Sequence, residues 1–263
     1  MTEPHILLTS DPRGVATVTL NRPQVHNAFD DQVIAELTAT LRKVDADAGV
    51  RVVVLASTGK SFSAGADLGW MKRMALYSQE QNLEDARGLA ALMSTLDRLV
   101  KPTVALVQGP AYGGGVGLVA CCDIAVAVDT VSFALTEARL GLIPAVIGPY
   151  VAAAIGARAC RRYFLTSERF DAAQALRLGL VHRVVPAAEL AAAGEATIKT
   201  LLDCGPQAQA ECKAFIRRVA HGPVDDAMVE HSALTIARIR ASAEGKEGVG
   251  AFLEKRKAGW IKA

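Results

Sequence analysis

The sequence has 263 residues, of which 51% are hydrophobic and 21% are charged, and its formal net charge at pH 7 is +2. This length is sufficient for a large core in one or two domains, and the apolar content argues against general disorder. A net charge this small does not favour nucleic-acid binding. The five cysteines have no C-x-x-C spacing, which argues against a zinc knuckle or a disulfide framework and indicates a reducing, cytoplasmic compartment.

Two long uncharged stretches, residues 102–122 and 140–157, raise the question of a membrane span. Proline interrupts both stretches, and a block of three glycines interrupts the first. We therefore expect both to be buried core and the protein to have no membrane segment. Charged residues before the first apolar stretch also argue against a signal peptide.

The first half of the chain predicts alternating strands and helices. Alternation of threonine with apolar residues predicts a strand over residues 15–20. Asp30 is placed to cap a helix with apolar residues at helical spacing. An apolar run predicts a strand over 51–57, followed by a Gly/Ser-rich turn, and a leucine repeat predicts a helix that ends before Pro102.

The pattern continues and then becomes helical. We expect strands at 103–107 and 124–128, with a turn and a helix over 113–122 between them. A short helix follows between Asp171 and Gly179, then a last strand at 181–185. The order predicts an α/β core over residues 1–186 and a helical region over 187–263.

Several familiar motifs are absent. The segment Thr58-Gly59-Lys60-Ser61 ends like a phosphate-binding loop, but the glycine required five residues before Gly59 is replaced by Val54. Residues 113–117 lack dinucleotide-binding spacing, and residues 59–63 lack the final glycine of a nucleophile elbow. The histidines are scattered, so we expect no metal site.

Two turns remain as candidates for chemistry. Residues 62–68 and residues 109–115 each place small residues directly after a predicted strand. Small residues let a ligand approach the backbone, and a helix N-terminus offers unpaired N–H groups. One N–H from each turn, aimed at a single point, would form an oxyanion hole. Each turn alone is also compatible with an ordinary tight connection.

The two turns belong to a longer series of motifs. In chain order these are Asn21-Arg22-Pro23, Asn27-Ala28, residues 62–68, Tyr112-Gly113-Gly114-Gly115, Cys122-Asp123-Ile124, residues 137–144 and residues 252–256. In their composition, order and spacing, the chain resembles the enoyl-CoA hydratase/isomerase (crotonase) superfamily over nearly its whole length.

The resemblance implies a spiral of strand-strand-helix repeats with a C-terminal helical region used to assemble trimers or hexamers. It implies an acyl-CoA substrate, with coenzyme A as part of the substrate and no separate cofactor. The thioester oxygen would be held by the N–H groups of Ala66 and Gly114. The positions that correspond to the family's coenzyme A contacts are Ala28, Ala64, Asp67 and Leu68, together with Phe252 and Lys255, which in some members reach a neighbouring subunit's coenzyme A.

The reaction depends on the carboxylates. Well-known hydratases of the family use two glutamates, and this chain retains only the second, at Glu137, with Gly117 at the position of the first. A single carboxylate suits a hydratase in which Glu137 orients the water, and it also suits a Δ3–Δ2 enoyl-CoA isomerase. A non-catalytic CoA- or RNA-binding relative is a third hypothesis, disfavoured by the retained glutamate and the weak net charge.

The acyl group is expected to be set by pocket shape. We expect Trp70, Met71, Met74, Gly117, Pro144 and the segment 145–150 to form the acyl pocket. The segments 113–120, 133–137 and 161–166 resemble bacterial hydratases of branched glutaconyl-type CoA esters, the 3-methylglutaconyl- and isohexenylglutaconyl-CoA branch. Such enzymes act in leucine or acyclic terpene breakdown. Because of this local resemblance, a hydratase is the preferred hypothesis.

Overall fold

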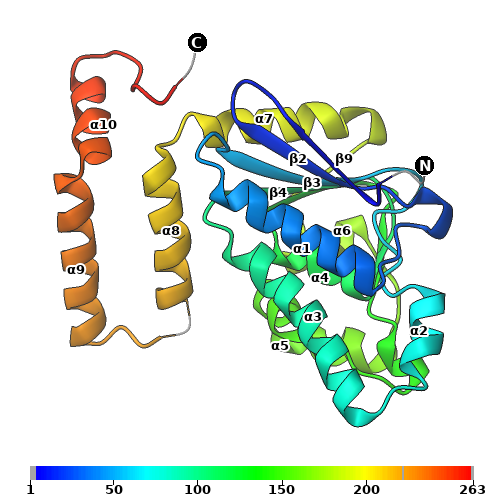
Figure 1. The fold of residues 1–263 in the computed structure, drawn as a ribbon. Helices are drawn as coiled ribbons and strands as arrows, with labels where there is room; N and C mark the ends of the chain where they lie inside the picture. The colour runs from blue at the N-terminus through cyan, green and yellow to red at the C-terminus, as the bar shows by residue number, and fades with distance from the viewer. Residues whose placement is uncertain (1–3, 221, 262–263) are drawn as a thin grey trace.

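The computed structural model describes residues 4–220 and 222–261. Its main sheet has six strands in the order β1-β2-β3-β4-β6-β9 (Figure 1). These are β1 (Ile6–Ser10), β2 (Val15–Leu20), β3 (Val52–Ser57), β4 (Thr103–Val107), β6 (Ile124–Val128) and β9 (Arg183–Val185). β1 runs antiparallel to β2, and every other neighbouring pair is parallel. The carboxyl ends of β2, β3 and β4 therefore lie on one edge of the sheet.

Both faces of this sheet are covered. On β3, Val53 and Leu55 pack into the main core, whereas Val52 and Val54 pack into a second cluster with Ile198. The first face is covered by α1 (Asp31–Ala46), α3 (Gln79–Arg98) and α4 (Gly114–Cys121), and the second by α7 (Leu190–Leu202). Burial on both faces explains why the parallel strands are continuously apolar.

The fold also contains a second, smaller sheet of three strands. It contains β5 (Ala111–Tyr112), β7 (Ser132–Ala134) and β8 (Phe170–Asp171). The remaining elements are α2 (Leu68–Met74), α5 (Gly148–Thr166), α6 (Ala172–Leu178) and 3-10 helices at Pro23–Val25, Glu137–Leu140 and Ala187–Glu189. Of these, α6 contacts both β7 and β8.

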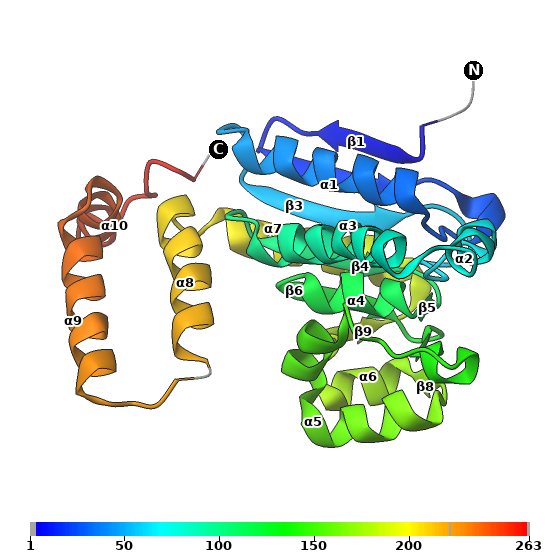
Figure 2. The same ribbon diagram turned by 60° about the horizontal axis from the view of Figure 1, so that its bottom comes forward.

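The last three helices form an arm. α8 (Pro206–Val219), α9 (Asp226–Ala241) and α10 (Ala243–Leu253) stand to one side of the body in both views (Figures 1 and 2). The predicted division at residue 186 falls just after β9, but α7 still packs on the sheet, with Gly194 against Leu106. The projecting part of the chain therefore begins at α8.

Most predicted elements of the core are present. The strands at β2, β4 and β6 have the predicted bounds, and Asp30 accepts a hydrogen bond from the N–H of Val33 at 3.0 Å to cap α1. Asp171 caps α6 in the same way, and Gly179 ends it with a left-handed backbone. β1, α2 and the small sheet were not predicted, because their sequences are short and carry no clear periodicity. None of the described helices combines the length and apolar character needed to cross a bilayer.

Candidate active site

The two small-residue turns lie side by side. The turn after β3 pairs with the turn after β4 through a bridge between Ser63 and Ala111, in which the N–H of Tyr112 donates to the Ser63 carbonyl at 2.9 Å. A second bridge joins Ala66 to Phe29, in the segment that leads into α1. The parallel strands β3 and β4 bring the turns to the same edge of the sheet, and these bridges then lock them together.

The bridge to Phe29 determines where the N–H of Ala66 points. Phe29 donates to the carbonyl of Gly65 at 2.9 Å and accepts from the N–H of Asp67 at 3.0 Å. Both bonds lie on the Phe29 side, so the N–H of Ala66, between them, faces the opposite side. Ala66 lines a pocket, to which Phe29 also contributes.

The second candidate donor lies at the start of α4. Gly114 is the first residue of this helix, so its N–H belongs to the first turn, which has no acceptor within the helix. Gly114 lines the same pocket as Ala66. A helix N-terminus also places partial positive charge at this point. The two N–H groups thus meet the positional requirement for an oxyanion hole.

Glycine is required where the turns meet. Gly65 has a φ of +83°, and a Cβ there would lie 2.8 Å from the carbonyl oxygen of Tyr112 and 3.3 Å from the nitrogen of Gly114. A Cβ on Gly114 would lie 2.3 Å from Cζ of Phe29. Side chains at these positions would push the two turns apart, so the glycines keep the donor groups close.

The side chain of Asn27 stabilises the turn after β3 through hydrogen bonds. Its buried amide donates to the carbonyls of Thr58 and Ser61 at 2.7 and 2.8 Å, and its carbonyl accepts from the N–H of Arg22 at 2.8 Å. Its φ of 53° is in the left-handed region, which asparagine tolerates better than most residues. One side chain thereby ties the approach to α1 to the loop that carries Ala66.

We expect Asn27→Ala to destabilise the fold by about 3 kcal/mol, because three hydrogen bonds of about 1 kcal/mol each are lost. Denaturant titration measures this change. Asn21→Ala is the matched control and should cost less, because it removes only a bond to the Pro4 carbonyl and a bond from the Thr58 hydroxyl, both 3.2 Å long. Equal effects of the two substitutions would show that Asn27 does not organise the loop.

Glu137 provides the carboxylate of the site. It begins the 3-10 helix after β7, and its Oε1 lies 3.2 Å from the point that a Cβ on Gly113 would occupy. Gly113 is itself tied to β7, since its N–H donates to the Ala134 carbonyl at 2.9 Å. The Glu137 Oε2 is buried and has no hydrogen-bond partner among the described residues. Burial raises the pKa of this carboxyl above its usual value.

These groups share one pocket of about 520 Å³. Glu137, Ala66 and Gly114 all line it. Its apolar wall comes from α2, α3 and the segment 140–147, and includes Trp70, Met71, Met74, Leu89, Pro144 and Ile147. This volume suits a small organic group, with the polar atoms gathered at one place.

Most of the predicted pocket residues line this cavity, but Gly117 and residues 148–150 of the predicted segment 145–150 do not. Trp70, Met71, Met74 and Pro144 line the cavity. Gly117 does not reach it and lies behind Ile147, whose Cγ2 is 2.3 Å from the point that a Cβ on residue 117 would occupy. The sequence prediction of Gly117 as a lining residue is therefore corrected, since side-chain packing across α4 was not visible in the sequence.

The predicted coenzyme A positions fall into two groups. Ala64 lines the pocket, Leu68 is 75% exposed beside it, and Asp67 caps α2. Arg22 holds Ala28 and Asp67 together: it donates to the Ala28 carbonyl at 2.7 Å and lies 3.5 Å from the Asp67 carboxylate. Ala28, Ala64, Asp67 and Leu68 therefore form one group, which we call the rim.

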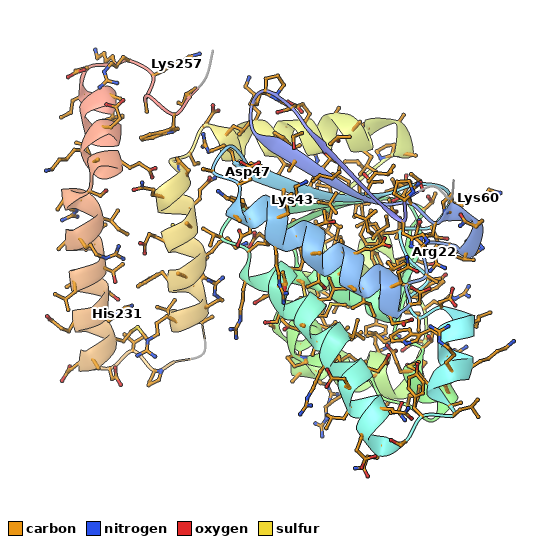
Figure 3. The ribbon with its side chains drawn as sticks, viewed as in Figure 1. Arg22, Lys43, Asp47, Lys60, His231 and Lys257 are labelled. Carbon is orange, nitrogen blue, oxygen red and sulfur yellow. The ribbon has the colours of Figure 1, made fainter. Side chains whose placement is uncertain are left out.

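Phe252 and Lys255 lie elsewhere. They belong to the end of α10 and the turn after it, on the arm. Figure 3 shows Lys257, next to this segment, far from Arg22, which marks the rim. Within a single chain the two groups are not brought together. Phe252 is 81% exposed, so its side chain is available to another surface.

Sequence reasoning missed the contribution of α3. This helix begins at Gln79, capped by a box in which Ser78 and Gln81 bond reciprocally, and places Asn82 and Asp85 on the pocket. Asp85 also accepts from Nε1 of Trp70 at 2.8 Å, which fixes the indole. The Ser-x-x-Gln spacing of the capping box was the available signal. Ile147 was covered by the predicted segment 145–150 but was not singled out.

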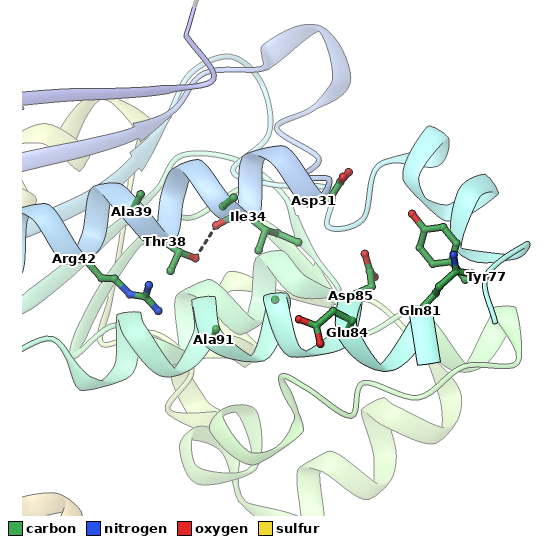
Figure 4. Close-up of a pocket in the computed structure, with 12 residues that line it drawn as sticks. Asp31, Ile34, Thr38, Ala39, Arg42, Tyr77, Gln81, Glu84, Asp85 and Ala91 are labelled. Atoms are coloured by element: carbon green, nitrogen blue, oxygen red, sulfur yellow. Dashed lines mark hydrogen bonds between the residues drawn. The ribbon is translucent and has the colours of Figure 1, made fainter. Parts of the chain in front are cut away.

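A second cavity lies on the other side of α3, between it and α1 (Figure 4). This groove of about 630 Å³ shares Asp85 with the site, and its other polar residues include Asp31, Arg42 and Glu84. Neither Glu137 nor the two backbone donors line it. The chemistry therefore belongs to the smaller pocket. Among the described residues, no three His, Cys, Asp or Glu side chains are grouped as metal ligands.

Comparison with known proteins agrees with this site. Residues 10–263 match the family model described as enoyl-CoA hydratase/isomerase. The crystal structure of an enoyl-CoA hydratase from Shewanella pealeana is 46% identical, with a TM-score of 0.95 over 98% of this chain and 96% of its own. That of an enoyl-CoA hydratase from Mycobacterium smegmatis is 35% identical, with a TM-score of 0.93 over 99% and 100%.

A curated relative points the same way. The crotonyl-CoA hydratase of Syntrophomonas wolfei is 31% identical over 98% of each chain. Together with the structural matches, this similarity confirms the α/β crotonase-type fold expected from the sequence. The chain belongs to the enoyl-CoA hydratase/isomerase family.

Proposed function

We propose that this protein is an enoyl-CoA hydratase in which Glu137 is the acid/base and the N–H groups of Ala66 and Gly114 hold the thioester oxygen. The observation that carries the proposal is that all three residues line one pocket, where a buried Glu137 oxygen has no hydrogen-bond partner among the described residues. An acyl-CoA substrate suits this arrangement, because its thioester carbonyl becomes negatively charged during reaction.

The proposed reaction adds one water molecule across the double bond between carbons 2 and 3. Glu137 takes a proton from the water as its oxygen bonds to carbon 3 of the enoyl chain. The double-bond electrons move toward the thioester, whose oxygen becomes an enolate held by the two N–H groups. The protonated Glu137 then delivers its proton to carbon 2 as the thioester carbonyl re-forms. A well-placed donor in such a hole contributes about 3–4 kcal/mol to transition-state stability.

For the acyl group, we propose a branched, glutaconyl-type CoA ester, which would place the enzyme in leucine or acyclic terpene breakdown. The support is the local resemblance of residues 113–120, 133–137 and 161–166 to that group of hydratases. The rival activity is Δ3–Δ2 isomerisation, which the same single carboxylate would serve by moving a proton along the chain.

We also propose that the arm assembles trimers or hexamers in the cytoplasm. Exposed apolar side chains on α10, Val249, Phe252 and Leu253, support self-association. In such an assembly Phe252 and Lys255 would contact coenzyme A bound to a neighbouring copy. The five cysteines are free thiols, which suits a reducing compartment.

A substrate panel tests the reaction. The protein is incubated with crotonyl-CoA, 3-methylglutaconyl-CoA and 3-hexenoyl-CoA, and the absorbance of the conjugated thioester is followed. We expect absorbance to fall with the first two, and to fall faster with 3-methylglutaconyl-CoA. A rise with 3-hexenoyl-CoA and no fall with the others would establish the isomerase instead. No change with any of the three would contradict both assignments.

A further inference from the structure

Two glycines, the N-cap residue Gly113 and Gly117 within α4, lie under two different side chains. Gly113 and Gly117 are one helical turn apart, and the N–H of Gly117 donates to the Gly113 carbonyl at 3.3 Å. Glu137 lies above the first glycine, and Ile147 lies above the second. Glu137 and Ile147 also line the same pocket. Ile147 is therefore an apolar wall residue in the pocket of the catalytic carboxylate.

The fit between Ile147 and Gly117 leaves no spare room. An added Cβ on residue 117 would lie 2.3 Å from Cγ2 of Ile147 and 2.8 Å from its Cβ. The sulfur of Met93 closes the other side at 3.3 Å. Ile147 is only 2% exposed and Met93 is fully buried, so neither side chain moves aside into solvent. A close-packed site of this kind does not absorb an added atom without backbone shifts.

The backbone of Ile147 is also held. It is the N-cap residue of α5, and its carbonyl accepts the N–H of Val151 at 3.0 Å. The side chain thus stands at a fixed position between the pocket, which it lines, and α4, which it covers. Substitution at this residue changes the shape of the pocket wall directly.

We infer that Ile147 determines acyl-chain specificity: paired with Gly117, it forms an apolar wall beside Glu137 that limits the length of the acyl chain. The inference rests on the proposed hydratase function. The same pairing explains why α4 presents no second carboxylate, because any side chain at residue 117 would need the space that Ile147 fills. The wall selects compact, apolar acyl carbons at this point.

Truncation of Ile147 tests the wall. Ile147→Ala opens the pocket toward Gly117 and Met93, and Ile147→Val removes one methyl group while keeping Cγ2. Hydration of crotonyl-CoA and of trans-2-decenoyl-CoA is measured for each variant. We expect the ratio of kcat/KM for decenoyl-CoA to that for crotonyl-CoA to rise about tenfold in Ile147→Ala, and less in Ile147→Val, since a methylene group in an apolar pocket changes specificity by about 10- to 200-fold.

Ile155→Ala is the matched control. Ile155 lies two turns further along α5, is 7% exposed and does not line the acyl pocket. It loses the same atoms, so it should lower stability and leave the substrate ratio unchanged. An unchanged ratio in Ile147→Ala, or an equal change in Ile155→Ala, would overturn the inference. Because the wild type is assayed first, its failure to hydrate either ester would instead contradict the proposed function.

The pairing itself is tested by stability. Gly117→Ala should lower the midpoint of thermal unfolding, since the new methyl group meets Ile147 and Met93. Adding Ile147→Gly to the same chain should make the effect of Gly117→Ala smaller than it is beside isoleucine. Comparing the two single variants with the double variant isolates this interaction. Additive effects would show that residues 117 and 147 are not coupled and would contradict the inference.

Discussion

Glu137→Gln is expected to lower kcat for enoyl-CoA hydration about 100- to 10,000-fold, the usual contribution of a positioned acid/base. The amide keeps the size of the side chain but cannot accept and return the proton. Binding of the acyl-CoA should persist, because coenzyme A and the thioester oxygen are held by other groups. Steady-state kinetics and isothermal titration with a non-reactive acyl-CoA measure the two effects separately.

The pH dependence follows from the direction of the Glu137 pKa. Burial raises the pKa of this carboxyl, so the basic form that accepts a proton from water is lost at a higher pH than for an ordinary glutamate. We therefore expect kcat/KM to fall on the acid side, with a midpoint above the usual glutamate value. This acid limb should be absent from the residual activity of Glu137→Gln.

As the pH rises, the contribution of Glu137 to folding stability should fall while its contribution to activity rises. A carboxyl whose pKa is raised by folding contributes stability when it is protonated, at low pH, and that contribution is lost as the pH rises through the raised pKa. Ionised Glu137 is therefore a cost to the fold at neutral pH, which Glu137→Gln should relieve. The control is Glu189→Gln, at the exposed end of another 3-10 helix, which should leave kcat unchanged. A Glu137→Gln enzyme that is fully active would contradict the catalytic assignment.

Ala66→Pro is expected to lower kcat/KM about 100- to 1,000-fold, the loss found when one donor of an oxyanion hole is removed. Proline has no N–H, so the thioester oxygen would keep only the donor from Gly114. The two bonds that join this turn to Phe29 use the Gly65 carbonyl and the Asp67 N–H, so neither is lost by the substitution.

Ala66→Gly is the matched variant because it changes the side chain and keeps the N–H. It should retain activity within a few fold of the wild type, while circular dichroism and thermal unfolding verify that Ala66→Pro is folded. If both variants were equally impaired, the side chain of Ala66, and not its N–H, would be the important group. If neither were impaired, the oxyanion hole would have to be located elsewhere.

The main sheet was predictable because its signals are local. Parallel strands that are buried on both faces consist of short apolar runs, so the bounds of β2, β4 and β6 could be predicted from residue types alone. Helix caps are equally local, as Asp30 and Asp171 illustrate. The small sheet was not predictable, because two- and three-residue strands depend on neighbours distant in the chain.

The site was predictable in its parts. The two small-residue turns could be identified from residue types, and the family resemblance supplied Glu137 and the way in which these groups act together. Asp85 could not be singled out, because its importance comes from facing Trp70 across two helices. The resemblance named the coenzyme A positions on the arm, but within a single chain α10, which carries Phe252, lies on the opposite side of the molecule from α2, which begins at Leu68 of the rim (Figure 1).

By itself, the sequence determined the α/β class, the strands of the core and the two turns, because these are properties of residue type and spacing, and its resemblance to the family implied one glutamate in place of two. Only the tertiary structure decided that Ile147 fills the space above Gly117, that Gly117 lies outside the pocket, and that an oxygen of Glu137 has no partner among the described residues. The physical reason is that packing and desolvation depend on atoms brought together from α4, α5 and the segment between them. No local pattern encodes those distances.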